Sequence, residues 1–188
     1  MNIAIYSGSF NPLHIGHLAI IKHMIEEAGF DMVYLIVSPK NPLKEGISSA
    51  TGLDRYNAAQ EAVSRHFSES VRRVHVDDIE LYMPEPHYTV RTLRALKERE
   101  PENSFTFVMG ADNLADIRRW REYTAILKDF GVAVFPRIGH DLTEIKQDLL
   151  NEDPAYKIQI LDAPLVNISS TEIREAISKG EDISALLM

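Results

Sequence analysis

Residues 2–17 read NIAIYSGSFNPLHIGH, which places a short apolar run directly before a turn-rich loop. The continuous hydrophobicity of residues 2–7 is typical of a strand that is buried on both faces of a sheet. After the loop, apolar residues recur every three or four positions over residues 18–28 and stop at Gly29, which indicates a helix with a glycine end. The stretch therefore predicts a strand, a loop and a helix in that order.

The rest of the chain repeats this alternation, with apolar runs that predict buried strands at residues 32–37, 74–76, 105–109, 132–135 and 158–161. Helical periodicity fills the intervals, including residues 120–128, and the pairs Asp141 with Glu144 and Ser169 with Glu172 resemble capping boxes. This pattern indicates one α/β domain over residues 1–188, with a doubly wound, mostly parallel sheet. Ligands bind such sheets beyond the carboxyl ends of the strands, so the loops after residues 7, 37, 109 and 161 should share one crevice.

Composition and charge exclude several classes of function. A balance of 20 basic against 28 acidic residues gives a net charge of −8, which opposes broad binding of nucleic acid but allows one small anion to be held locally. The absence of cysteine excludes disulfides, zinc-thiolate sites and cysteine nucleophiles. Without an apolar run of roughly 18 residues or a secretory signal, we expect a cytoplasmic protein with no membrane partner. A homo-oligomer is compatible with the sequence.

The loop after the first strand has the residue types of a phosphate site. Gly8 allows close backbone approach, Gly16 keeps the start of the helix free of side-chain bulk, and the unpaired N–H groups of a helix start attract anions. His14 and His17 lie one turn apart, so both imidazoles can donate to phosphate oxygens and stabilise charge during an in-line displacement. A lone histidine is usually structural, but two that flank a glycine at this kind of turn favour function.

Residues 8–17 resemble the Gly-x-Phe-x-Pro-x-His-x-Gly-His signature of the nucleotidyltransferase superfamily, which has a Rossmann-like fold. Its second signature, Ile-Ser-Ser-Thr-x-Ile-Arg, is matched by residues 168–174, where hydroxyls, helix N–H groups and a fixed arginine charge can surround an anion. Simple helix capping by Ser169 is the alternative interpretation. The resemblance implies ATP binding by Gly8, Ser9, Phe10, Gly16, Ile168, Ser169, Ser170 and Thr171, and catalytic roles for His14, His17, Lys44 and Arg174.

Along essentially its whole length the chain is similar to bacterial nicotinate-nucleotide adenylyltransferases. The resemblance implies that AMP passes from ATP to nicotinate mononucleotide by direct in-line attack, giving nicotinate adenine dinucleotide and pyrophosphate in NAD biosynthesis. It also implies Mg²⁺, which accompanies the triphosphate. No metal-binding cluster of Asp, His or Glu is evident in the sequence, so we expect the ATP phosphates to carry this ion. The alternatives are a related transferase acting on nicotinamide mononucleotide or phosphopantetheine, and a non-catalytic nucleotide-binding regulator. Size and acidity oppose an aminoacyl-tRNA synthetase.

The resemblance also assigns residues that would contact the nucleotides outside the two signatures. Gly110 and Asp112 match a strand-ending Gly-Ala-Asp whose carboxylate accepts hydrogen bonds from ribose hydroxyls, although Asp112 could instead cap the next helix. Lys44, in a proline-rich loop, and Arg55 match positions that bind phosphate, and the resemblance implies that both bind the pyridine nucleotide. A solvated basic loop is the alternative for Lys44.

Three further positions match residues that bind the pyridine nucleotide. Trp120 would stack on the pyridine ring, with a core tryptophan as the alternative, and Tyr88 with Thr89 would present backbone donors to the nicotinate carboxylate at a helix start. The chain departs from the family at Leu43, where many members have histidine, and at Arg91, where many have aspartate. Leu43 lies beside the lysine that would bind phosphate. Arg91 lies near the residues that would distinguish the acid group of nicotinate from the amide group of nicotinamide. The family often continues into a further apolar helix where this chain has residues 185–188.

Overall fold

The computed structural model describes residues 1–39, 51–67, 73–163 and 169–188. Within these ranges one sheet contains β1 (Asn2–Gly8), β2 (Met32–Val37), β3 (Val74–Asp77), β4 (Ser104–Gly110), β5 (Val132–Phe135) and β6 (Ile158–Ile160). The strand order is β3-β2-β1-β4-β5-β6, and neighbouring strands all pair in parallel. The expected doubly wound α/β fold is therefore confirmed. Because the strand order reverses between β1 and β4, a ligand crevice is expected at the carboxyl ends of these two strands.

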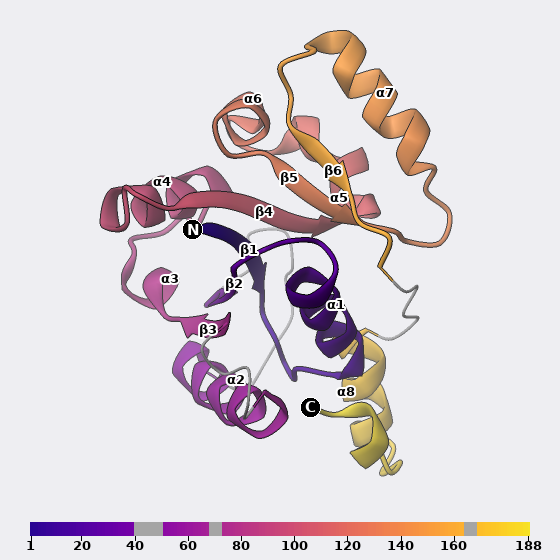
Figure 1. Ribbon diagram of the computed structural model, residues 1–188. Coiled ribbons are helices and arrows are strands. Elements are labelled where there is room, and N and C mark those ends of the chain that lie inside the picture. The colour runs from indigo at the N-terminus through magenta and orange to yellow at the C-terminus, as the bar shows by residue number, and fades with distance from the viewer. Residues whose placement is uncertain (40–50, 68–72, 164–168) are drawn as a thin grey trace.

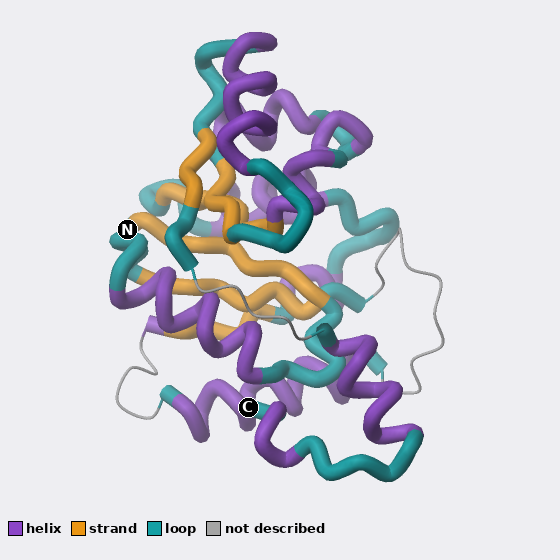
Figure 2. The backbone as a smooth tube through the Cα atoms, turned by 90° about the vertical axis from the view of Figure 1, so that its right-hand side faces the viewer, coloured by secondary structure: helices purple, strands orange, loops and turns teal. Residues whose placement is uncertain are grey.

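Helices cover both faces of the sheet, and Figure 2 shows the strands lying between them. In Figure 1, α1 (Ile15–Glu26), α2 (Gly52–His66) and α8 (Ser170–Ser178) lie below the sheet. Above it lie α4 (Thr89–Arg99), α5 (Ala111–Ala115), α6 (Tyr123–Ala125) and α7 (Leu142–Glu152), while the short α3 (Ile79–Tyr82) follows β3. In the described part of the chain, no helix is both long and apolar enough to cross a membrane.

Two hydrophobic clusters on opposite faces of the sheet hold these layers together. Alternate residues of β1 supply both clusters, since Ala4 and Tyr6 belong to one and Ile3 and Ile5 to the other. This alternation explains why the strands are apolar throughout. The longer helices α1, α2, α4 and α7 each contribute buried apolar residues, and fully burying one Leu or Ile side chain contributes roughly 1.5–3 kcal/mol.

The segment before β5 differs from the helix that the sequence predicts over residues 120–128. A 3₁₀ turn, Ile117–Arg119, is followed by Trp120 in an extended conformation, and the helix begins only at Tyr123. It then widens into a π-helical turn, Ile126–Phe130. The Trp120 ring packs edge-on against Phe107, with 5.8 Å between ring centroids. This contact with the core coincides with the break in the helical pattern that periodicity alone predicts.

Candidate active site

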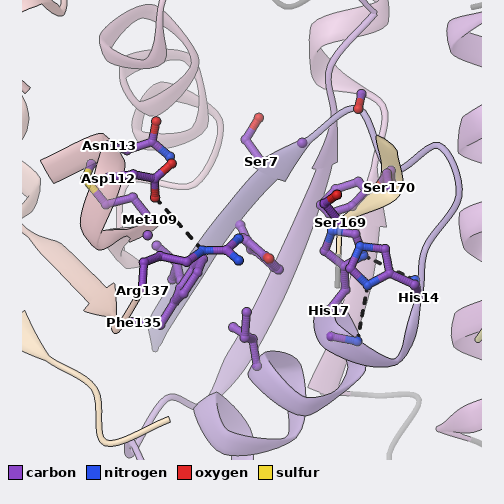
Figure 3. A pocket seen from close by; sticks show the side chains of 18 of the residues that line it. Ser7, His14, His17, Met109, Asp112, Asn113, Phe135, Arg137, Ser169 and Ser170 are labelled. Atoms are coloured by element: carbon purple, nitrogen blue, oxygen red, sulfur yellow. Dashed lines mark hydrogen bonds and ion pairs between the residues drawn. The ribbon is translucent and has the colours of Figure 1, made fainter. Parts of the chain in front are cut away.

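A cavity of about 320 Å³ opens where the strand order reverses. It is lined by many of the residues that the sequence assigns to ATP and to catalysis: Gly8, Ser9, Phe10, His14, Gly16, His17, Gly110, Asp112, Ser169, Ser170, Thr171 and Arg174. Figure 3 shows His14, His17, Ser169 and Ser170 on one side, and Asp112 and Arg137 on the other. The structure thus brings two distant sequence motifs to one cavity.

The other assigned residues lie elsewhere. Arg55, Tyr88, Thr89 and Trp120 are not among the residues that line this cavity. Lys44 and Ile168 lie outside the described residues. Their assigned contacts with substrate stay predictions.

Hydrogen bonds fix which nitrogen of each histidine carries the proton. His14 is the N-cap of α1, and its Nδ1 accepts a hydrogen bond from the backbone N–H of Gly16 at 3.2 Å. The Nδ1 of His17 accepts from the backbone N–H of His14, also at 3.2 Å. A nitrogen that accepts a backbone N–H must carry a lone pair. Each neutral imidazole therefore carries its proton on Nε2 and can donate it to an anion.

The surroundings keep both imidazoles neutral. Burial, followed by the positive charge of Arg137, lowers the pKa of His14 to about 4. Burial and the neighbouring His14 and Arg137 hold the pKa of His17 well below its usual value. The centroids of the two rings lie only 3.7 Å apart. If one imidazole were protonated, its positive charge would oppose protonation of the other. At neutral pH the pair is thus a pair of uncharged donors.

Helix α8 packs against residues 8–17, which we call the histidine loop. Ser170 Oγ donates to the carbonyl of Pro12 at 3.3 Å, and Arg174 donates to the carbonyl of Asn11 at 2.9 Å and to Thr171 Oγ1 at 3.0 Å. Ser169 does cap the helix, because its Oγ accepts from the N–H of Glu172 at 3.2 Å. Capping therefore accounts for Ser169, whereas Arg174 and Ser170 join α8 to the loop.

Arg137, just after β5, is a cavity residue that the sequence interpretation missed. Its guanidinium lies over the Phe135 ring, 5.1 Å from the ring centroid, and its Nε is 4.0 Å from Asp112 Oδ1. Gly110 makes room for this pair, because a Cβ there would lie 2.5 Å from Asp112 Oδ1 and 3.3 Å from Arg137 Nε. Asp112 does not cap α5, whose N-cap is Gly110. A signal was available, since residue 137 follows a strand that ends at this edge of the sheet.

The Gly-x-Phe part of the loop is also explained by packing. Phe10 has a left-handed backbone with φ +42°, which non-glycine residues seldom adopt. Its ring packs so close to Gly8 that a Cβ at residue 8 would lie 3.1 Å from Phe10 Cε1. Gly8 therefore makes room for the aromatic ring in addition to any approach of phosphate to the backbone. Strained residues of this kind cluster at ligand sites.

Comparison with known proteins identifies the family. A family described as cytidylyltransferase-like matches residues 5–176. A "Probable nicotinate-nucleotide adenylyltransferase" of Flavobacterium johnsoniae is 40% identical over 187 residues, which span 100% of this chain and 92% of the relative. The protein of that name from Bacteroides fragilis is 37% identical over 183 residues, spanning 97% and 85%. This chain belongs to the nicotinate-nucleotide adenylyltransferase family.

Solved structures share the fold of this adenylyltransferase family member. Plasmodium falciparum nicotinic acid mononucleotide adenylyltransferase complexed with NaAD matches with a TM-score of 0.79 at 22% identity, covering 97% of this chain and 87% of that chain. The complex of that enzyme with APC gives a TM-score of 0.73 at 21% identity, covering 99% and 90%. At such identities the likeness shows a common fold.

Arg55 of this family member binds the backbone of two loops at the edge of the sheet. Its guanidinium is buried and donates to the carbonyls of Ser9, Ser38 and Pro39 at 2.6, 2.8 and 2.9 Å. These carbonyls follow β1 and β2, so the side chain ties both loops together. Burial lowers the pKa of Arg55, but three carbonyl acceptors favour its charged form. This arrangement gives Arg55 a structural task whatever its role toward phosphate.

The residues that family resemblance assigns to the pyridine nucleotide lie on the α4 side of the sheet. Tyr88 is the N-cap of α4 and makes no side-chain capping bond. Trp120 is partly buried against the cluster on this face. Arg94 of α4 and Glu122 form an ion pair at 2.7 Å, which places α4 beside the segment that carries Trp120. Arg91 bends back to donate to the carbonyl of Pro86 at 2.8 Å.

The last residues of the chain also support the site. Leu187 forms an antiparallel β-bridge with His14, and the backbone N–H of Met188 donates to the carbonyl of Leu13 at 3.5 Å. The Met188 side chain is buried in the cluster that contains Phe10 and Leu13. Residues 187–188 therefore contact the loop that carries His14.

Proposed function

We propose that this protein transfers AMP from ATP to nicotinate mononucleotide, giving nicotinate adenine dinucleotide and pyrophosphate. The observation that carries the proposal is the cavity at the start of α1, where His14 and His17 each present a neutral Nε2–H donor. Arg137 and Arg174 line the same cavity and supply fixed positive charge. Such a site suits a polyphosphate. The names of relatives at 33–40% identity support the pyridine acceptor.

The proposed reaction is an in-line displacement at the α-phosphorus of ATP. An oxygen of the mononucleotide phosphate forms the new P–O bond while the bond to the β-phosphate oxygen breaks, and pyrophosphate leaves with that electron pair. The nucleophile is already anionic at neutral pH, so no general base is required. Negative charge grows on the transferred group and on the leaving oxygen, where the Nε2–H donors of His14 and His17 and the arginines stabilise it. No enzyme nucleophile takes part.

We further propose that Mg²⁺ arrives on the triphosphate. Within the described residues, no group of three His, Asp or Glu side chains is placed to hold a metal ion. The carboxylate of Asp112 lines the cavity beside the Arg137 cation. Mg²⁺ commonly binds through phosphates and water with few protein ligands, where it neutralises phosphate charge. Asp112 remains available to ribose hydroxyls.

The pyridine half of the acceptor would lie near the start of α4. Tyr88 provides no side-chain cap for α4, so we propose that backbone N–H groups at the start of this helix bind the carboxylate. Trp120 lies on the neighbouring segment and would stack on the ring. We propose that Lys44 binds phosphate between the two halves. The partial positive charge at the N-terminus of α4 favours the anionic carboxylate of nicotinate over the neutral amide of nicotinamide.

Parallel incubations with ATP, Mg²⁺ and one acceptor test this function. We expect pyrophosphate release and a dinucleotide product with nicotinate mononucleotide, and much less with nicotinamide mononucleotide or phosphopantetheine. Release only with another acceptor would reassign the substrate, and no release with any of the three would refute the transfer. His17→Ala should lower turnover by roughly 10² while the circular dichroism spectrum is preserved, because a transition-state donor is lost.

A further inference from the structure

Tyr6 of β1 lines the nucleotide cavity but has no part in the site described so far. Its side chain is only 7% exposed, and the residue is one of those that form the cavity wall. In the described chain the Tyr6 hydroxyl makes no hydrogen bond with protein. The fully buried side-chain atoms that lack a partner there are Arg55 Nε and Glu80 Oε2, so the Tyr6 oxygen is not completely buried. The hydroxyl therefore has access to the cavity that the residue lines.

Aromatic packing fixes the Tyr6 ring between the two sides of the cavity. Its centroid lies 5.6 Å from that of Phe10, 6.0 Å from that of His17 and 6.1 Å from that of Phe135. Phe135 carries the Arg137 guanidinium on its face. Figure 3 shows Phe135 and Arg137 across the cavity from His17. Tyr6 thus lies between the histidine pair and the Arg137 cation.

The Tyr6 hydroxyl is a neutral donor in this position. Burial is the main cause that raises its pKa far above the ordinary value, and the charges of Arg137 and Asp112 act on it in opposite directions. A neutral phenol has one O–H to donate. A buried polar group without a protein partner is costly unless a ligand or water satisfies it.

We propose that the Tyr6 hydroxyl donates a hydrogen bond to the triphosphate of the bound nucleotide, as a third uncharged donor between His17 and Arg137. This inference rests on the proposed function for the identity of the nucleotide. The chemistry requires only an anionic phosphate chain in the cavity. Because phosphate oxygens are charged acceptors, one such bond is worth about tenfold or more in affinity.

Tyr6→Phe removes the hydroxyl and keeps the ring that packs against Phe10, His17 and Phe135. Calorimetric titration without acceptor should show the Kd for Mg-ATP and for inorganic tripolyphosphate raised about tenfold. The Kd for adenosine should stay unchanged. The melting temperature should not fall, since no protein hydrogen bond is lost.

Tyr34→Phe is the matched control. Tyr34 is also 7% exposed and lies on the adjacent strand, but its hydroxyl donates to Glu100 at 3.0 Å on the other face of the sheet. This variant should lose stability and keep wild-type affinity for all three ligands. A role of Tyr6 in folding alone would give Tyr6→Phe the same behaviour as the control.

Two results would overturn the inference. One is an ATP affinity of Tyr6→Phe within twofold of wild type, and the other is an equal loss of affinity for ATP and adenosine. The proposed function fails separately, when the wild-type protein releases no pyrophosphate from ATP with nicotinate mononucleotide. A tripolyphosphate effect in Tyr6→Phe would then still establish the donor and leave only the acceptor misassigned.

Discussion

Lowering the pH should destabilise the protein through His14, by an amount that the structure sets. The pKa of this imidazole falls from 6.5 to about 4 on folding, mainly through burial. Below pH 6.5 the unfolded chain binds a proton that the folded chain does not, so stability is lost as the pH falls toward 4. Between about pH 8 and about pH 5.5 this one group should lower the free energy of unfolding by about 1.4 kcal/mol.

The variant His14→Asn isolates this contribution. An Asn Oδ1 can accept from the N–H of Gly16 as Nδ1 does, and Asn is a favoured N-cap, so the start of α1 is kept while the titrating ring is removed. Carboxylates and the other histidines are common to both proteins. The pH-dependent loss in wild type should therefore exceed that in the variant by about 1.4 kcal/mol.

Urea unfolding at the two pH values measures the difference, with Trp120, the only tryptophan, as the fluorescent probe. Equal losses in both proteins would place the folded pKa of His14 near 6.5. The imidazole would then be partly charged at neutral pH, and the description of the pair as two uncharged donors would be wrong. Stability is the better readout here because the substrate phosphates also titrate between these pH values.

Three further substitutions test other contacts of the site. Arg137→Met should lower kcat/KM for ATP by about 10² through loss of a charged donor, and nuclear magnetic resonance titration should show the pKa of His14 raised. Arg55→Lys should lower the free energy of unfolding by about 1–3 kcal/mol in urea titrations, because one ammonium cannot reach three carbonyls; an unchanged stability with a raised KM would instead favour a phosphate contact. Met188→Ala should destabilise by about 2 kcal/mol and reduce turnover several-fold in the pyrophosphate assay, whereas unchanged turnover would separate this segment from the histidine loop.

Local physics made most of the fold predictable. Strands buried on both faces must be apolar throughout, and crossover helices need one apolar stripe, so the α/β alternation is written into hydrophobic periodicity. The phosphate-binding character of residues 8–17 was equally predictable from the sequence. The spacing of its glycines, proline and two histidines at a helix start is typical of an anion site. What such patterns lack is information on which side chains of distant segments meet.

Several residues show what only these contacts reveal. Tyr6 looks like any aromatic residue of a buried strand until Phe135 and His17 are placed beside it. Arg55 has the charge of a phosphate ligand, and only the fold shows three carbonyls around it. Trp120 is extended and packs against Phe107 at a point where periodicity alone predicts a helix. Arg137 was within reach, since it follows a strand that ends at the crevice.

The two helix starts that line the cavity depend on each other. The bonds that join them link residues far apart in the chain, from Ser170 to Pro12 and from Arg174 to Asn11. Among its described residues α8 fully buries only Ile173, so its own packing holds it weakly, and the contacts with the histidine loop must supply part of its stability. The same contacts hold the loop whose backbone N–H groups fix both imidazole tautomers. Packing of α8 against the histidine loop therefore positions Ser170 and Arg174. It also fixes the orientation of the Nε2–H groups of His14 and His17, so these donors are in place before a triphosphate binds.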